Sequence, residues 1–381
     1  MSMLGVGIIG CGNISASYLS LAPLFNFIDV CAVSDLNMDA ARARAEAYNV
    51  RAEAIESLLT ADNIDIIVNL TVPSAHFEVT RQILHNGKHA YSEKPYVLSL
   101  EDGEALRSIA AQKQLRVGSA PDTFLGGSHQ LARAVIDEGK IGKVVGGTCH
   151  IMSHGMERWH PNPDFFFKPG GGPLLDMGPY YITNLVQLIG PVKAVTAMAG
   201  SAFDVRTIEN GPREGEKISV ETPTTVHAVL QFANGAIVTL GASWDVWAHR
   251  HANMELYGTD ASLYIPDPNF FGGDVELADA DGSTQVLAGR DHPFSVPNAG
   301  NSTDPQRANY RCAGLADMAA GILEGRPHRC SLELATHVVD VMTAILAAAD
   351  AKCTVELTTT CERPAPLNSN DALKLLKAAN T

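Results

Sequence analysis

The chain has 381 residues, of which 46% are hydrophobic and 18% are charged, and its formal net charge is −14. This length is sufficient for two domains with separate cores. The acidic balance disfavours nucleic acids and anionic membranes as partners, because both attract basic proteins, so we expect a small molecule as the partner.

The sequence shows no sign of secretion, a membrane span or a structural metal. Its first residues, MSMLGVGIIG, enter a strand pattern without the basic region and cleavage site of a signal peptide. The apolar stretches are too short to predict a membrane span. Seven cysteines without C-x-x-C spacing indicate reduced thiols rather than disulfides or zinc ligands. We therefore expect a soluble, cytoplasmic protein without a metal site.

The first predicted elements are an apolar strand, a glycine turn and a helix. Gly10 and Gly12 lie at the strand-to-helix junction, where a dinucleotide-binding fold needs a tight turn and close approach to a pyrophosphate. Asn13 and Ile14 follow at the start of the helix, and Ser15 replaces the third glycine of the usual G-x-G-x-x-G pattern. The turn predicts a dinucleotide site that includes Gly10, Gly12, Asn13 and Ile14.

The second strand pattern, FIDVCAVSDLN, ends in Asp35. An acid at this distance from the glycines suits the ribose hydroxyls of the adenosine and repels a 2′-phosphate. We therefore expect NAD rather than NADP as the cofactor. The alternative is that Asp35 only caps the helix that follows.

Strand and helix patterns continue to alternate as far as residue 119, which is typical of a parallel, doubly wound sheet of Rossmann type. Ligands bind such sheets at the carboxyl ends of the strands. We therefore expect an NAD-binding domain over residues 1–122. The residues at the strand ends that we expect near the cofactor are Thr71, Pro73, His76, Glu93 and Lys94.

The pattern changes after residue 122. Strands predominate, and Asn234-Gly235 between two of them is a strong hairpin signal. We expect an α+β domain over residues 123–360, built on a large, mostly antiparallel sheet with one open face. Another subunit usually covers such a face, which favours a homodimer or homotetramer. Residues 361–381 are interpreted as a tail with a short docking helix.

An acid and a phenol lie four residues apart in the segment GGGPLLDMGPYYITN, residues 170–184. On a helix, Asp176 and Tyr180 would project from one face. We place Pro179 in the first helical turn, where its missing N–H costs little. The pair is either structural, as a helix-terminal acid and a half-buried aromatic residue, or half of an active site.

An aromatic loop, ERWHPNPDFFFKP, precedes this helix. We expect Trp159 and His160 to contact the substrate, because aromatic faces with a few polar groups suit a carbohydrate ring. Further candidates for ligand contact are Trp244, Trp247 and His249.

Three segments, read in order, resemble signatures of the Gfo/Idh/MocA oxidoreductase family: GCGNIS, TVPSAHFEVTRQILHNGKHAYSEKP and GGGPLLDMGPYY. The resemblance implies that Lys94, in the E-K-P motif, hydrogen-bonds the reacting oxygen beside the nicotinamide. It also aligns Asp176 and Tyr180 with the family's D-x-G-x-H pattern. Two departures are Tyr180 in place of histidine, as in the glucose–fructose oxidoreductase and dihydrodiol dehydrogenase branches, and Thr183, where many members have aspartate.

Proton transfer is the task that these residues imply. An ordinary phenol ionises at about pH 10, but a neighbouring ammonium group favours the phenolate. Lys94 would thus allow Tyr180 to act as an acid or base, with Asp176 fixing the geometry. Lys94 and the acid–phenol pair belong to different predicted domains and are expected to converge on one cleft, which favours the functional interpretation over the structural one.

The expected function is that of an NAD-dependent oxidoreductase. It would transfer a hydride between nicotinamide and a hydroxyl or carbonyl group of a monosaccharide, polyol or cyclic sugar derivative. The segment FFFKPGGGPLLDMGPYY is similar to bacterial sugar dehydrogenases that act on D-apiose. Two alternatives stay open: a non-catalytic NAD(P)-sensing regulator of the same fold, and a glycosidase that recycles bound NAD.

Overall fold

The computed structural model describes residues 2–287, 291–301 and 304–378. The chain divides into two compact units. The first comprises Met1–Gly127, Arg290–Thr336 and Pro364–Thr381, and the second comprises Ser128–Gly289 and His337–Arg363. Both units are therefore discontinuous in sequence, which differs from the predicted succession of 1–122, 123–360 and a tail.

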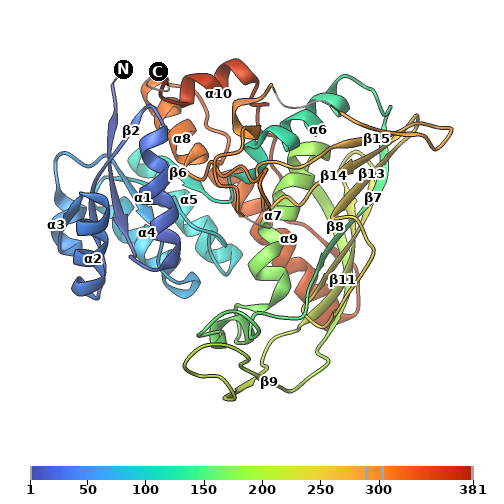
Figure 1. Ribbon diagram of the computed structural model, residues 1–381, viewed down its shortest axis with the longest axis horizontal. Helices are drawn as coiled ribbons and strands as arrows, with labels where there is room; N and C mark the ends of the chain where they lie inside the picture. The colour runs from blue at the N-terminus through green and yellow to red at the C-terminus, as the bar shows by residue number, and fades with distance from the viewer. Residues whose placement is uncertain (1, 288–290, 302–303, 379–381) are drawn as a thin grey trace. The chain divides into compact units, whose positions relative to one another are not determined.

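A six-stranded parallel sheet forms the centre of the first unit (Figure 1). The strand order is β3-β2-β1-β4-β5-β6, which reverses beside β1, as in dinucleotide-binding sheets. This confirms the predicted doubly wound fold. The strands are β1 (Leu4–Ile9), β2 (Ile28–Ser34), β3 (Arg51–Ala52), β4 (Ile66–Asn69), β5 (His89–Ser92) and β6 (Val117–Ser119). The connecting helices are α1 (Asn13–Leu21), α2 (Met38–Tyr48), α3 (Ile55–Thr60), α4 (His76–His85) and α5 (Leu100–Lys113).

Burial explains why β1, β2 and β4 are largely apolar. All four residues of β4 are buried, and Val6, Ile8 and Val33 are at most 1% exposed. Helices that cover both faces of a parallel sheet exclude water from both sides, so no polar alternation remains. The core of the first unit therefore runs along β1, β2 and β4.

The returning segments of the chain are fixed to the first unit by buried polar contacts. α8 (Ala313–Glu324) begins where the Asp122 carboxylate accepts hydrogen bonds from the backbone N–H groups of Cys312 and Gly314, both at 3.0 Å. Farther along, Asp317 is fully buried and pairs with Arg329 at 2.5 Å. The tail forms α10 (Ser369–Leu375), and Leu376 after it makes an antiparallel bridge with Phe25.

The second unit is built on a nine-stranded sheet in the order β16-β15-β14-β13-β7-β12-β11-β8-β17. β12 pairs with β7 in parallel, whereas the other neighbouring strands are antiparallel. The strands are β7 (Val144–Met152), β8 (Val192–Gly200), β11 (Thr225–Phe232), β12 (Ile237–Ser243), β13 (Met254–Gly258), β14 (Ser262–Ile265), β15 (Glu276–Ala278), β16 (Thr284–Val286) and β17 (Val355–Glu356). A separate two-stranded ribbon joins β9 (Val205–Thr207) and β10 (Lys217–Ser219).

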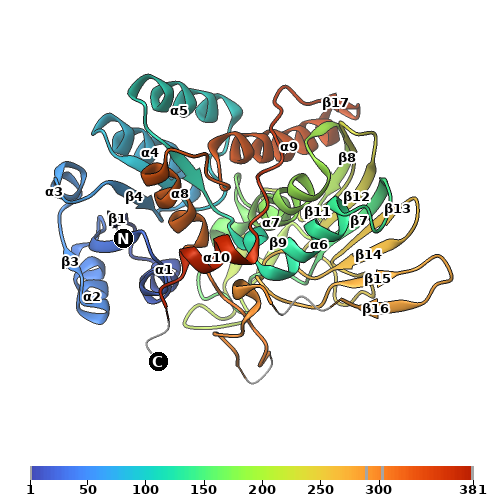
Figure 2. The same ribbon diagram turned by 90° about the horizontal axis from the view of Figure 1, so that it is seen from above.

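One face of the nine-stranded sheet is packed, and the other is open. On β11, Val226, Leu230 and Phe232 are at most 1% exposed, while the alternate residues are partly or largely exposed. α7 (Gly172–Ile189) contacts β7, β11 and β12 (Figure 2). The open face presents Met198, which is 82% exposed, and Ile237. This confirms the predicted antiparallel sheet with one open face.

Helix α9 (Leu332–Ala351) crosses the boundary between the two units in the sequence. By length and composition it could span a bilayer, so the prediction that no apolar stretch is long enough was wrong. However, 67% of the apolar window is buried inside the protein, as in the core helix of a globular fold. A further helix, α6 (Gly127–Asp137), precedes β7 in the sequence.

The cap of α8 predicts a pH dependence of stability. Burial raises the pKa of the Asp122 carboxyl to about 6, against the lowering effect of the Gly314 N–H. An unfolded aspartate ionises at about pH 4. The folded protein therefore holds this proton more tightly than the unfolded chain, and its stability falls as the pH rises from about 4 through about 6.

Asp122→Asn keeps an oxygen acceptor for the two backbone N–H groups and cannot ionise. A difference of two pKa units corresponds to about 3 kcal/mol. Urea denaturation should therefore show the variant gaining about 2–3 kcal/mol relative to the wild type between pH 4 and pH 7. Parallel stability curves for the two proteins would contradict this assignment.

Candidate active site

The glycine turn after β1 has the backbone geometry that a dinucleotide requires. Gly10 has a φ of +105°, and a Cβ there would lie 2.5 Å from the carbonyl oxygen of Leu70, so a side chain has no room. Gly12 is exposed, and nothing lies within 4 Å of the position of its missing Cβ. No side chain caps the N-terminus of α1. Its first N–H groups are thus suited to a phosphate.

Ser15 takes the place of the third glycine without opening this turn. Its side chain is fully buried, and its hydroxyl donates to the carbonyl oxygen of Gly12 at 2.6 Å. The backbone N–H of Ser15 donates to the same oxygen at 3.2 Å. A small residue therefore suffices at this position, and its hydroxyl ties the first turn of the helix to the glycine turn.

The Asp35 carboxylate accepts hydrogen bonds from two backbone N–H groups. One carboxylate oxygen accepts from the backbone N–H of Cys11 at 2.7 Å, and the other accepts from the N–H of Asn37 at 2.8 Å. Each oxygen has a further lone pair, so bonds to ribose hydroxyls stay possible. The alternative that Asp35 only caps the next helix is wrong, because the N-cap of α2 is Asn37, whose side chain accepts from the N–H of Asp39 at 3.1 Å. The ribose role of Asp35 stays a prediction.

Arg44 on α2 was not anticipated from the sequence. Its guanidinium donates to the carbonyl oxygens of Cys11 at 3.4 Å and Gly12 at 3.2 Å. The glycine turn is thus held by an acid on its N–H side and by a base on its carbonyl side. Only the separation of 33 residues hides Arg44 from sequence reasoning, because no local motif links it to the turn.

The loops after β4 and β5 are joined by His76. Its Nδ1 lies 2.7 Å from the carbonyl oxygen of Pro95, and its Nε2 lies 3.0 Å from that of Thr71. The ring is 1% exposed, and burial lowers its pKa. The hydroxyl of Thr71 donates to Asn69 at 2.7 Å. The structure therefore makes His76 a brace between two loops, while Thr71 and Pro73 are half-buried in the first loop.

Glu93 fixes the start of the E-K-P segment. One of its carboxylate oxygens accepts from the hydroxyl of Tyr18 at 3.0 Å, and the other accepts from the backbone N–H of Lys94 at 2.9 Å. Burial, and then the charge of Glu93, raise the pKa of Tyr18. Tyr18 was not anticipated from the sequence, because it lies 75 residues from Glu93. Lys94 is half-buried at the carboxyl end of β5.

In the second unit, three glycines make the entry to α7. Gly170 and Gly172 both have a φ of +90°, which disfavours any other residue. A Cβ on Gly171 would lie 2.5 Å from the carbonyl oxygen of Phe166 and 2.6 Å from that of Phe165. The helix starts at Gly172, so Pro179 lies inside it. Our prediction that Pro179 lies in the first turn was wrong. The error arose because Pro173, and not Pro179, occupies the first turn.

Asp176 and Tyr180 lie one turn apart on α7, on the same side of the helix. Asp176 is half-buried and Tyr180 is 8% exposed. The neighbouring Tyr181 differs, since its hydroxyl donates to Asp267 at 3.2 Å and accepts from Asn253 at 3.1 Å. Burial, reinforced by Asp267, raises the pKa of Tyr181. Tyr181 therefore has a structural role, and Thr183, 3% exposed, lies one turn from Tyr180 inside the unit.

The aromatic loop before α7 separates into exposed and buried residues. Trp159 is 59% exposed, and the ring of His160 packs edge-on against it with centroids 5.5 Å apart. Phe167 and Trp244 are at most 1% exposed and belong to one hydrophobic cluster. Trp244 is therefore a core residue. Trp247 is 71% exposed and stacks on His154, whereas His249 stacks on His251.

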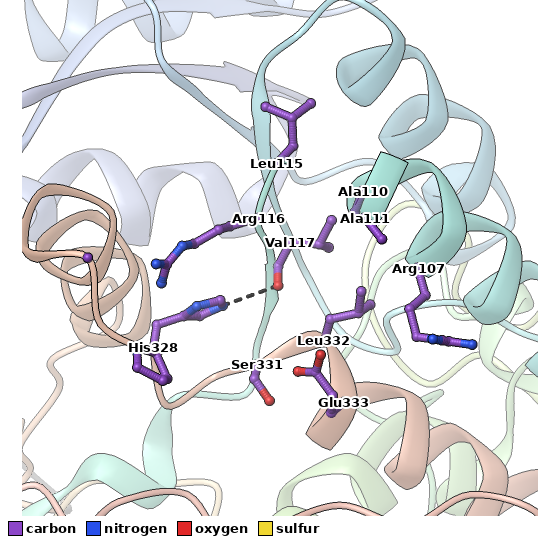
Figure 3. Close-up of a pocket in the computed structure, with 12 residues that line it drawn as sticks. Arg107, Ala110, Ala111, Leu115, Arg116, Val117, His328, Ser331, Leu332 and Glu333 are labelled. Carbon is purple, nitrogen blue, oxygen red and sulfur yellow. Dashed lines mark hydrogen bonds between the residues drawn. The ribbon is translucent and has the colours of Figure 1, made fainter. Parts of the chain in front are cut away.

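A cavity of about 520 Å³ lies in the first unit (Figure 3). It is lined by α5, the start of β6, the segment between α8 and α9, and the first residues of α9. His328 Nε2 lies 3.2 Å from the carbonyl oxygen of Val117, as Figure 3 shows, and Arg116 donates to the carbonyl oxygen of Arg326. Because these groups bond to the protein itself and lie at the amino end of β6, the cavity does not contribute to the dinucleotide site.

Two family models match the chain. A model described as an oxidoreductase family with an NAD-binding Rossmann fold matches residues 4–120, and a model of the GFO/IDH/MocA C-terminal domain matches residues 129–264. The two matches together cover most of both units.

Curated relatives are similar over different lengths. An uncharacterised oxidoreductase of Schizosaccharomyces pombe is 30% identical over 172 residues, which is 44% of this chain and 46% of the relative, so the chain spans about half the length of that protein. Levoglucosan dehydrogenase of Pseudarthrobacter phenanthrenivorans is 24% identical over 330 residues, covering 77% of this chain and 82% of the relative. A solved structure of levoglucosan dehydrogenase with NADH has a TM-score of 0.78 at 22% identity and covers 94% of this chain and all of that one. This structural likeness shows the fold.

The entry to α7 gives a testable prediction. Gly171→Ala places a methyl group against two carbonyl oxygens at 2.5 and 2.6 Å. Relieving this contact requires the loop or the helix to shift, and overpacking of this kind costs about 1–3 kcal/mol of folding free energy. Gly200→Ala is the matched control, because nothing lies within 4 Å of a Cβ at Gly200. Urea denaturation of both variants checks the prediction, and equal stabilities would contradict it.

Proposed function

The chain belongs to the Gfo/Idh/MocA oxidoreductase family and has its NAD-binding Rossmann fold, and on this basis we propose that it is an NAD-dependent dehydrogenase of a monosaccharide, polyol or cyclic sugar derivative. The observation that carries the proposal is the retention of Lys94 in the E-K-P segment together with Asp176 and Tyr180 on one side of α7. A protein that only sensed the nucleotide would not need these three residues.

The described residues fit the cofactor. Gly10 and Gly12 leave the backbone of the turn accessible, and the uncapped N-terminus of α1 supplies N–H groups for the pyrophosphate. Asn13 and Ile14 lie in the first turn of that helix, and Asp35 supplies acceptors for the adenosine ribose. NAD, when bound, supplies the hydride acceptor or donor. Thr71, Pro73 and Lys94 lie on loops at the carboxyl ends of β4 and β5, where we propose the nicotinamide end of the cofactor.

Proton transfer is the role that we propose for Lys94 and Tyr180. The Lys94 ammonium donates to the reacting oxygen of the substrate, and the Tyr180 hydroxyl gives or takes the proton. Asp176, one turn earlier on α7, orients the substrate hydroxyl or a neighbouring donor. A buried phenol is well suited to this task, because water competes poorly for its proton.

A sugar or polyol is the substrate class that the second unit supports best. Trp159 presents an exposed aromatic face, and His160 presents a polar edge beside it. Such faces bind the apolar side of a sugar ring, while polar groups read its hydroxyls. Relatives named as dehydrogenases of levoglucosan and of inositol agree with this class. A branched pentose such as D-apiose is one candidate within it.

We further propose that a second copy of the chain covers the open face of the nine-stranded sheet. Met198, Val229 and Ile237 on this face are between 38% and 82% exposed, and such side chains are usually covered by a subunit. The described cysteines are all free, which fits a reducing compartment such as the cytoplasm.

The experiment that tests the proposal is a substrate panel. The purified protein is incubated with NAD and with pentoses, hexoses, polyols, inositols, anhydrosugars and lactones, and the absorbance of NADH is followed. We expect net formation of NADH with at least one cyclic sugar or polyol. Conversion of a glycoside without net NADH would point to the NAD-recycling alternative, and binding of NAD without any turnover would point to the regulator.

The choice between NADH and NADPH gives a prediction for the first unit. The wild type should bind NADH at least about tenfold more tightly than NADPH, because the Asp35 carboxylate repels a 2′-phosphate. Asp35→Ser should reduce this preference for NADH over NADPH, since the positively charged Arg44 stays beside the glycine turn and attracts the 2′-phosphate. Asp39→Ser is the control, because its exposed carboxylate pairs with Arg42. Fluorescence titrations with both nucleotides check the prediction, and a preference for NADPH in the wild type would refute it.

Two adjacent tyrosines on α7 separate catalysis from packing. Tyr180→Phe should lower kcat by about two to four orders of magnitude, the usual effect of losing a general acid or base. Tyr181→Phe loses hydrogen bonds to Asp267 and Asn253, so it should cost stability and change kcat by less than about threefold. Steady-state kinetics and thermal unfolding of both variants distinguish the two roles.

The same assay tests whether Lys94 and Tyr180 act as one unit. Lys94→Ala alone should cost about as much kcat as Tyr180→Phe alone, and the double variant should cost little more, because groups that serve one step are not additive. Fully additive losses of kcat, or near-normal kcat in either single variant, would contradict the proposed role of Lys94 and Tyr180 in proton transfer. NADH affinity is measured in parallel and should be nearly unchanged in Tyr180→Phe.

A further inference from the structure

The loop that carries Trp159 and His160 is held by the β9–β10 ribbon. Residues of both segments share one hydrophobic cluster with Trp244, namely Met156, Phe166, Phe167, Ile208 and Ile218. The backbone is also joined: the N–H of Glu209 donates to the carbonyl oxygen of Glu157 at 2.9 Å, and the side chain of Asn210 donates to that of Trp159 at 2.7 Å. The position of the aromatic loop therefore depends on the position of the ribbon.

Arg206 on β9 lies at the centre of this assembly. Its guanidinium donates to the Glu157 carboxylate at 2.8 Å and to the carbonyl oxygen of Trp244 at 3.1 Å, and it also pairs with Asp245. Its cation lies over the ring of Phe203, 4.7 Å from the centroid. One side chain thus connects three segments: the aromatic loop, the ribbon and the end of β12.

These charges are buried. Arg206 is 4% exposed and Glu157 is 2% exposed. Asp245 accepts further hydrogen bonds from Thr224 at 2.8 Å and from Thr225 at 2.6 Å, which fixes its carboxylate on the large sheet. The ion pair is thus anchored on the sheet at one end and on the aromatic loop at the other.

The network is incompletely satisfied within the part of the chain that the structure describes. Glu157 Oε2 and Arg206 Nε have no hydrogen-bond partner among the described residues. A buried ionic cluster with unsatisfied atoms stabilises a fold less than apolar packing would, so its use here favours a role in fixing a position. The position that it fixes is that of Glu157, two residues before Trp159.

We propose that Arg206 is a positioning residue for substrate binding, which sets the place of Trp159 and His160 through Glu157. The proposal rests on the proposed function, because it assigns these two residues to the sugar site. The backbone N–H groups of both residues donate to the carbonyl oxygen of Met156, at 3.2 and 2.9 Å, so the turn that presents them starts one residue before Glu157. A displaced Glu157 moves this turn.

Arginine is required here because a planar guanidinium can serve several acceptors in fixed directions. A lysine would keep the charge and present a single nitrogen, which cannot hold Glu157, Trp244 and Asp245 together. Arg206→Lys is therefore the main test variant. Glu157→Gln is a second one, since it keeps the size of the side chain and an oxygen acceptor for Arg206 while removing the charge.

Hydrogen exchange measured by mass spectrometry tests the positioning without any substrate. In Arg206→Lys, the amides of residues 156–160 should exchange about tenfold faster or more, while those of α7 beyond Tyr180 stay unchanged. Kinetics with the sugar found in the panel should show KM raised about tenfold and kcat changed by less than about threefold. Trp159→Ala should likewise raise KM while changing kcat little. Glu157→Gln should show a smaller effect in the same direction.

Arg213→Lys is the matched control on the same ribbon. Arg213 also pairs with the aromatic loop, through Asp164, but the side chains of this pair are 31% and 42% exposed, and ion pairs open to solvent contribute little. We expect nearly unchanged exchange and KM. Unchanged exchange in Arg206→Lys, an unchanged KM despite faster exchange, or an equal effect of Arg213→Lys would each overturn the proposal. If no sugar is turned over by the wild type, the proposed function fails, and the exchange experiment still decides whether Arg206 holds the loop.

Discussion

The backbone of Gly10 meets the backbone of Leu70 with no space for a side chain between them. This contact brings the turn after β1 against the turn after β4, at the point where the strand order of the first sheet reverses. Further hydrogen bonds in this region stabilise the arrangement of the two turns. Asp35 and Arg44 hold the N–H and carbonyl sides of the glycine turn, and Ser15 closes the helix behind it.

Hydrogen bonds join the loops at the carboxyl ends of β4 and β5. Asn69 donates to the backbone carbonyl of His76, and Glu93 donates through its backbone N–H to that of Asn69. His76 then links the loop of Thr71 to Pro95. Lys94 lies within this frame, so its place is set by residues that need not touch any ligand.

Sequence reasoning succeeded where a residue's role depends on its near neighbours. The glycine turn, the parallel sheet and the spacing of Asp176 and Tyr180 all follow from local pattern, and the structure has these elements. It failed for Pro179, because two prolines compete for the first turn of one helix and the spacing does not choose between them. Trp244 and Trp247 look alike in sequence, yet one is core and the other is 71% exposed. Arg44 and Arg206 were missed because their partners lie far away along the chain. Arg206, for example, meets Glu157 across 49 residues.

The first unit is made of three separate stretches of the chain, and this affects the order in which the protein can be completed during synthesis. Phe25 bridges to Leu376, and the Asn26 side chain donates to the carbonyl oxygens of Lys374 and Leu376. A ribosome that makes the chain from its N-terminus releases the first half of this unit long before those partners exist. The Rossmann sheet must therefore wait in an incomplete state, without α8 and α10, while strands β7 to β16 of the nine-stranded sheet are being translated.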